Sequence, residues 1–84
     1  MYRIVPDPET AEQVAALPVD ALLDYAQVLT VLEISPWAGS PQNIANPEGA
    51  VRRWAFGPGQ AGQVIYLVLE QQREVHLLMV QWLG

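Results

Sequence analysis

The most restrictive feature of the sequence is a pair of apolar segments near its C-terminal end. Gln63 to Leu69 and Val75 to Trp82 are rich in Val, Leu and aromatic residues, and the polar run Glu70 to Glu74 joins them. Two such segments separated by a short polar turn predict an antiparallel hairpin. Both sets of alternate positions are apolar, so both faces of this hairpin should avoid water.

The division of residues between the two faces depends on the turn. With Gln71 to Arg73 as the turn, Glu70 pairs with Glu74 and Leu78 and Met79 fall on opposite faces. One face then holds Val64, Tyr66, Val68, His76, Leu78, Val80 and Trp82, and the other Ile65, Leu67, Leu69, Val75, Leu77 and Met79. A slip of one residue would mix the sets, so the face that meets the rest of the protein stays open.

The residues before the hairpin predict one strand and two helices. Tyr2 to Val5 has strand composition, Asp7 can cap a helix and Pro8 can occupy its first turn. Pro18 should end that helix and open the next. The second helix has an apolar stripe of Leu22, Tyr25, Ala26, Leu29 and Leu32, with Asp20, Asp24, Gln27 and Thr30 opposite. We therefore expect a helical hairpin with an acidic outer face.

Irregular structure and a third apolar segment lie between the helices and the hairpin. Pro36 to Gly49 should lack regular structure, and Asn46 to Gly49 suits a type I turn. Ala50 to Phe56 is the next predicted strand, and Gly57 to Gly62 a flexible connection. The prediction is a single α+β domain over residues 1–84 in the order β-α-α-β-β-β. Its helical hairpin packs on one face of a mainly antiparallel, four-stranded sheet.

The predicted helices can cover only one of the two apolar sheet faces. An exposed apolar patch of several hundred Å² marks a protein interface. We therefore expect a protein partner, which is either a second copy of this chain or a different protein.

Charge and composition restrict the other classes of partner. The formal net charge is −5, and the first 35 residues hold six of the nine acidic residues but only one of the four Arg. So few cations cannot neutralise many phosphates, which argues against tight nucleic-acid binding. The absence of Cys fits a cytoplasmic location, and neither a cleavable leader nor a membrane span is expected. No residues suggest a cofactor, a metal or a small-molecule substrate.

The order of elements and several short motifs resemble the RelE/ParE superfamily of bacterial toxin-antitoxin proteins. The motifs are Tyr2-Arg3-Ile4 leading into Pro8, then Leu17-Pro18, Val64-Ile65-Tyr66, and Val75-His76-Leu77-Leu78-Met79-Val80. The likeness covers nearly the whole chain. It implies the same fold, and it implies a cognate antitoxin that wraps around the toxin.

The resemblance transfers the family's ribonuclease chemistry poorly. Ribonuclease members have an Arg where this chain has Gln63, and Gln cannot supply the permanent charge that stabilises a phosphoryl transition state. Arg53 matches a commonly basic position, but such a site needs several cations. Enzymatic activity is therefore doubtful, and we assign no catalytic residues. Gyrase-poisoning members also lack the ribonuclease residues, so that activity is not excluded.

The candidate site is therefore an interaction face. It consists of Arg52, Arg53, Gln63, His76, Met79 and Trp82. His76 has no second His or Cys to work with, so an interface position suits it better than general-base catalysis. The function predicted is that of a toxin-like protein that acts by protein binding. The alternatives are a small homodimeric or accessory module without toxicity, and a ribosome-dependent mRNA endoribonuclease.

Overall fold

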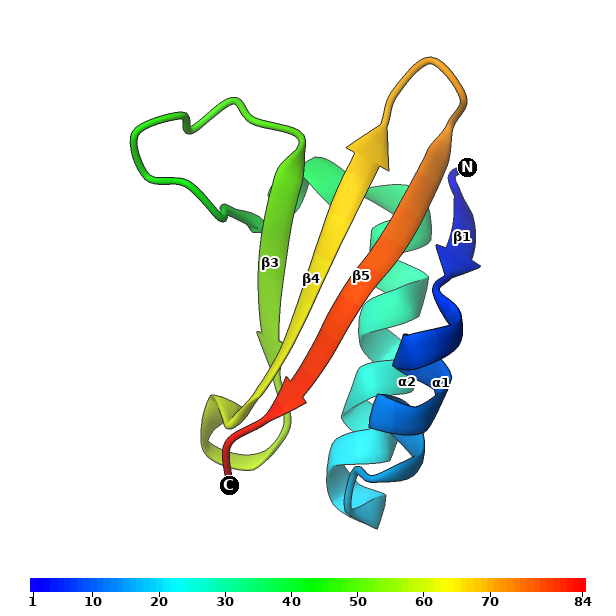
Figure 1. Ribbon diagram of the computed structural model, residues 1–84, viewed down its shortest axis with the longest axis vertical. Helices are drawn as coiled ribbons and strands as arrows, with labels where there is room; N and C mark the ends of the chain where they lie inside the picture. Colours follow the sequence, from blue (N-terminus) through cyan, green and yellow to red (C-terminus); the bar gives the residue numbers. More distant parts are fainter.

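The computed structural model describes every residue from Met1 to Gly84, and a five-stranded sheet with two helices on one side forms its framework (Figure 1). The elements are β1 (Arg3–Pro6), α1 (Pro8–Ala15), α2 (Val19–Ile34), the short 3₁₀ turn η1 (Pro36–Ala38), β2 (Ser40–Pro41), β3 (Val51–Phe56), the 3₁₀ turn η2 (Pro58–Gln60), β4 (Gly62–Leu69) and β5 (Glu74–Trp82). The predicted α+β class and element order are confirmed.

The strands lie in the order β1-β5-β4-β3-β2, so the first and last strands of the chain are neighbours. β1 runs parallel to β5, and every other pair is antiparallel. The prediction of four strands was one short. β2 has only two residues, Ser40 and Pro41, which is too few to show an alternating pattern in the sequence.

The sequence signals at the helix ends operate as expected. Asp7 caps α1 by accepting a hydrogen bond from the backbone N–H of Glu9 at 3.0 Å, and Pro8 occupies the first turn. Pro18 is the N-cap of α2. Neither helix has the length and apolar character needed to cross a membrane.

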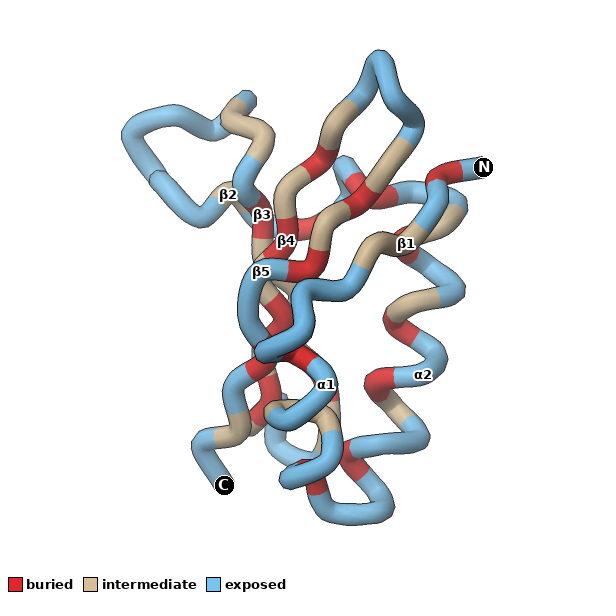
Figure 2. Tube along the Cα trace, turned by 45° about the vertical axis from the view of Figure 1, so that its right-hand side comes forward, coloured by how far each residue is buried: buried red, intermediate tan, exposed pale blue.

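The outer face of α2 differs from the acidic face that we expected. Ala21, Tyr25, Val28 and Leu32 form its buried side, and Figure 2 shows the alternation of buried and exposed positions along the helix. The predicted apolar stripe was therefore wrong at Leu22 and Ala26, which are exposed. The exposed side carries Val19, Leu23 and Ile34 in addition to acidic residues. Because the helix is apolar on both sides, the acidic residues only border its outer surface.

The hydrophobic core lies between the helices and the sheet. Its 13 buried members are Tyr2, Leu17, Ala21, Tyr25, Val28, Leu32, Phe56, Val64, Tyr66, Val68, Val75, Leu77 and Val80. Val64, Tyr66 and Val68 are every second residue of β4 and point into this core, whereas the residues between them point away from the helices.

Tyr66 ties the centre of the sheet to the end of the helical segment. Its side chain is fully buried, and its hydroxyl donates a hydrogen bond to the carbonyl oxygen of Pro36 at 2.7 Å. Gly39 makes room for this hydroxyl, since a Cβ there would lie 2.0 Å from it. Burial raises the pKa of Tyr66 to about 12.

Candidate functional site

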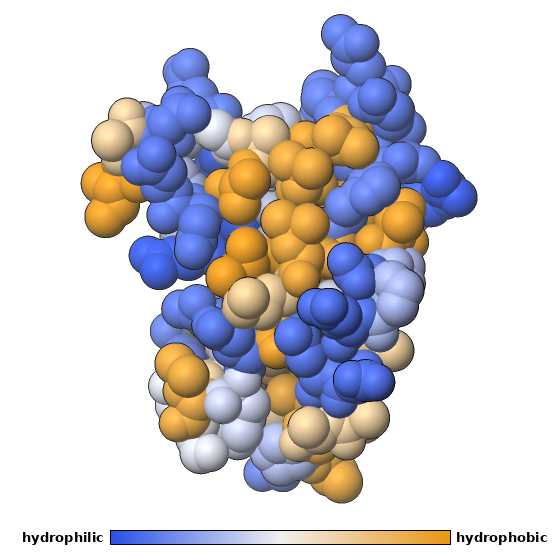
Figure 3. Space-filling model, in the orientation of Figure 1, coloured by the Kyte–Doolittle hydropathy of each residue, from blue (hydrophilic) through white to orange (hydrophobic).

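The side of the sheet that faces away from the helices is open and largely apolar, and we call it the open face. In the orientation of Figure 3 hydrophobic side chains gather over the middle of the molecule. The strand register places the outward residues in rows across the sheet. One row is Val5, His76, Leu67 and Val51, and the next is Met79, Ile65, Arg53 and Ser40. The prediction that one apolar sheet face lacks helix cover is confirmed.

A β-bulge in β5 changes the predicted division of the hairpin into faces. Tyr66 pairs with Leu77, but Ile65 pairs with Met79, which leaves Leu78 without a partner on β4. Leu78 and Met79 are therefore both exposed, at 40% and 37% of their surface, and not on opposite faces as expected.

The turn of the hairpin explains the rest of the register error. Leu69, not Glu70, pairs with Glu74, so the register near the turn is one residue away from the prediction. This slip turns Val75 and Leu77 inward and His76 outward. The bulge then restores the predicted register, and Val80 lies opposite Val64 in the core.

Four of the six residues of the predicted interaction face lie on the open face. They are Arg53, Gln63, His76 and Met79. Arg52 and Trp82 alternate to the other side, where Arg52 is buried and Trp82 packs against the core. The prediction lacked Val5 and Val51, since their place became clear only from the pairing of β1 with β5 and of β3 with β4.

Arg52 organises the loop between β2 and β3. Its guanidinium donates hydrogen bonds to three backbone carbonyl oxygens, those of Gly39 at 2.7 Å, Gly49 at 3.1 Å and Pro47 at 3.2 Å. It also lies over the ring of Trp37, 5.4 Å from the centroid. A guanidinium that is buried and donates to the protein's own backbone has a structural role.

Two other arginines are held by carboxylates at the edge of the sheet. Arg3 forms an ion pair with Glu74, which also lies 2.9 Å from Nε2 of His76. Hydrogen bonds from His76 and Arg3 lower the pKa of Glu74. This contact with Glu74 is the one side-chain hydrogen bond of His76, and it orients the imidazole ring within the open face.

A second carboxylate anchors the turn between β4 and β5. Glu70 accepts hydrogen bonds from the Tyr2 hydroxyl at 2.5 Å, from Trp37 Nε1 at 2.7 Å and from Arg73 at 2.7 Å. The Tyr2 and Trp37 bonds are the main reason that the pKa of Glu70 is lowered.

Arg3 and Arg73 are paired with carboxylates and Arg52 with carbonyl oxygens, so Arg53 is the one arginine with no carboxylate or carbonyl partner.

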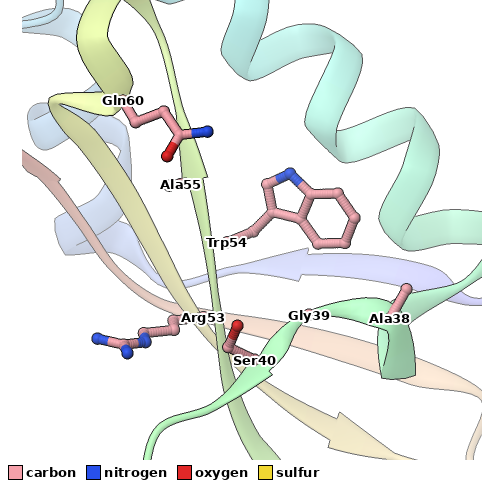
Figure 4. Close-up of a pocket in the computed structure, with 7 residues that line it drawn as sticks. All are labelled: Ala38, Gly39, Ser40, Arg53, Trp54, Ala55 and Gln60. Carbon is pink, nitrogen blue, oxygen red and sulfur yellow. The ribbon is translucent and has the colours of Figure 1, made fainter.

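Arg53 borders an open pocket of about 340 Å³ at the outer edge of β3. The pocket is lined by Ala38, Gly39, Ser40, Arg53, Trp54, Ala55 and Gln60. β2 pairs only with Arg52 and Arg53, so beyond them this edge of β3 has no neighbouring strand. Figure 4 shows Arg53 and Trp54 extending to opposite sides of β3, so one cation and one aromatic ring frame the pocket from different faces. No three His, Asp or Glu side chains come together in a way that could hold a metal ion.

Comparison with known proteins gives a likeness in structure rather than in sequence. No protein-family model matches the chain, and no curated protein is similar to it in sequence. The isolated E. coli RelE toxin superposes with a TM-score of 0.79 at 13% identity, over 100% of this chain and 86% of the other. A chain of the intact E. coli RelBE toxin-antitoxin complex gives 0.77 at 13% identity, over 100% and 99%.

A third structure extends the likeness to an archaeal protein. A chain of the RelE-RelB complex from Pyrococcus horikoshii superposes with a TM-score of 0.66 at 17% identity, over 99% of this chain and 96% of the other. The superpositions span the whole chain, from β1 to β5. These superpositions show that this protein has the fold of the RelE toxins.

Proposed function

We propose that this chain is a RelE/ParE-type, toxin-like protein that acts by binding another protein through the open face. The observation that carries the proposal is the make-up of that face. Val5, Val51, Leu67, Leu78 and Met79 are apolar residues that no helix covers. Surfaces of this kind bind protein partners, and burying about 800 Å² per chain is the usual scale.

The distribution of arginines supports binding over RNA cleavage. Arg3 and Arg73 are paired with carboxylates and Arg52 with carbonyl oxygens, which leaves Arg53 as the single unpaired arginine on the open face. Stabilising a phosphoryl transition state requires several preorganised positive groups. Gln63, which lies in the next row of the same face, has no charge to contribute.

The proposed partner is a cognate antitoxin-like protein. E. coli RelE and the archaeal RelE with the same fold have each been crystallised in complex with RelB. A partner of this type would cover the open face, as an apolar surface requires. A second copy of this chain is the alternative occupant of the same surface.

The experiment is co-expression with the protein encoded by the adjacent gene, followed by size-exclusion chromatography with light scattering. We expect a stable complex with wild type and none with Met79→Glu, which places a charge at the centre of the open face. A wild-type dimer that Met79→Glu converts to a folded monomer would favour the homodimeric module. A folded wild-type monomer that binds no neighbour-encoded protein would contradict the proposal.

A further inference from the structure

The outward side of α2 is a second apolar surface without a partner. Val19, Leu23, Ala26 and Ile34, with the small polar Thr30 among them, follow one another at helical spacing on the side opposite the core, and we call these five residues the α2 stripe. Val19, Leu23 and Ile34 are 74%, 65% and 62% exposed. Large apolar side chains that gather on an exposed helix face are typical of an interaction surface, so this stripe calls for a cover.

The α2 stripe has an acidic border without any compensating cation. Asp20 and Asp24 lie along one side of it and Glu33 along the other. None of these carboxylates forms an ion pair, and the chain contains no Lys or Arg between Arg3 and Arg52. No ion pair therefore neutralises the carboxylates that border the stripe.

This charge pattern discriminates between possible covers. Two copies packed through α2 would place acid against acid, with Asp20 facing either the same residue or Glu33 of the other copy, which is unfavourable in both directions. A membrane surface with anionic lipids would repel the same border. A protein segment with apolar residues flanked by Lys or Arg matches both the stripe and its border.

We propose that the α2 stripe docks a basic amphipathic helix of a partner protein. The partner helix has apolar residues at three- and four-residue intervals and Lys or Arg on both flanks. The 16 residues of α2 span about 24 Å, so a partner helix of about four turns covers the stripe. This surface is separate from the open face, because the sheet and the core lie between them (Figure 1). The inference therefore does not depend on the proposed function.

The test uses two synthetic 16-residue amphipathic helices, one built from Leu and Lys and the other from Leu and Glu. We expect the Leu-Lys peptide to bind the full chain by fluorescence anisotropy, and the Leu-Glu peptide to bind at least tenfold more weakly. Amide chemical shifts should change along residues 19–34 on addition of the Leu-Lys peptide. Asp20→Asn/Asp24→Asn should weaken the binding and reduce its salt dependence.

Site variants separate docking on α2 from non-specific attraction to an acidic protein. The double variant Leu23→Ser/Ile34→Ser should bind the Leu-Lys peptide at least tenfold more weakly than wild type. Ile44→Ser is the control and should leave the affinity unchanged, since Ile44 is an exposed apolar residue in the loop between β2 and β3. Met79→Glu should also leave it unchanged, so failure here is distinguishable from failure of the open-face proposal. Equal affinity for both peptides, shifts outside α2, or a wild-type dimer that Leu23→Ser/Ile34→Ser dissociates would overturn the inference.

Discussion

Ile65 and Met79 face each other across β4 and β5 on the side of the sheet that the helices leave open. Their pairing follows directly after the bulge at Leu78, which turns two successive apolar residues of β5 outward. Regular alternation would have pointed one of them into the core. The bulge therefore enlarges the apolar surface at the centre of the open face, where a partner would bury it most completely.

Neighbouring residues of β5 should respond to a charge in opposite ways. Leu77 is buried and Met79 is exposed. Leu77→Glu should unfold the protein, since an unpaired carboxylate in the core costs several kcal/mol. Met79→Glu should keep the wild-type circular dichroism spectrum and melting temperature. An equal loss of structure in both variants would mean that Met79 supports the fold.

The two adjacent arginines of β3 should differ in their effect on stability. Arg52→Ala leaves three backbone carbonyl oxygens without their donor, and it should lower the free energy of unfolding by about 2–3 kcal/mol. Arg53→Ala removes no hydrogen bond within the protein, so its effect should stay within about 0.5 kcal/mol. Urea denaturation of the two variants checks this. Equal destabilisation would contradict the structural role given to Arg52.

Stability should fall in strong alkali because of Tyr66. The pKa of Tyr66 is about 12 in the folded protein and about 10 in the unfolded chain. The stabilisation that this difference gives to the folded state is therefore fully present below pH 10 and is lost as the pH rises towards 12. Tyr66→Phe should flatten the curve of unfolding free energy over that range. Some slope should persist in this variant, because the pKa values of Tyr2 and Tyr25 are also raised.

Stability should fall in acid because of Glu70 and Glu74. Hydrogen bonds lower the pKa of both carboxyls in the folded protein. The two ionised carboxylates therefore stabilise the fold above the ordinary pKa of about 4.5, and this stabilisation is lost as the pH falls further. Glu70→Gln should reduce the acid sensitivity of the melting temperature. If the melting temperature of this variant falls in acid as steeply as that of wild type, the contacts of Glu70 with Tyr2 and Trp37 do not persist in solution.

Messenger RNA should not be cleaved by the pure protein on translating ribosomes. The reason is the single unpaired arginine of the open face, Arg53, beside the uncharged Gln63. Primer extension on a translated message measures this, with E. coli RelE as the positive control. New cleavages within codons, absent from the Arg53→Ala variant, would establish a ribonuclease instead.

Much of the fold was predictable because its signals are local. Asp7, Pro8 and Pro18 set the helix boundaries through capping and ring geometry, and the turn at Asn46 to Gly49 closes with the expected backbone hydrogen bond of 3.0 Å. The predicted strand ends lie within one residue of those observed.

Most parts of the structure that were mispredicted depend on tertiary context. A bulge adds one residue without any composition of its own, so the exposure of Leu78 beside Met79 could not be read from alternation. Grouping Arg52 and Trp82 with the interaction face was wrong for a local reason, because alternation along a strand already separates Arg52 from Arg53 and Trp82 from Met79. The pairing of β1 with β5, which brings Val5 beside His76, is a long-range contact that no local pattern encodes.

The central claim is that the open face binds a protein, and its most direct test is the mass of the species that this chain forms. Wild type and Met79→Glu are each co-expressed with the neighbour-encoded protein and measured by light scattering after size-exclusion chromatography. The account predicts a complex or a homodimer for wild type and a folded, unassociated monomer for Met79→Glu. A wild-type chain that stays monomeric at high concentration in the presence of that protein would contradict it.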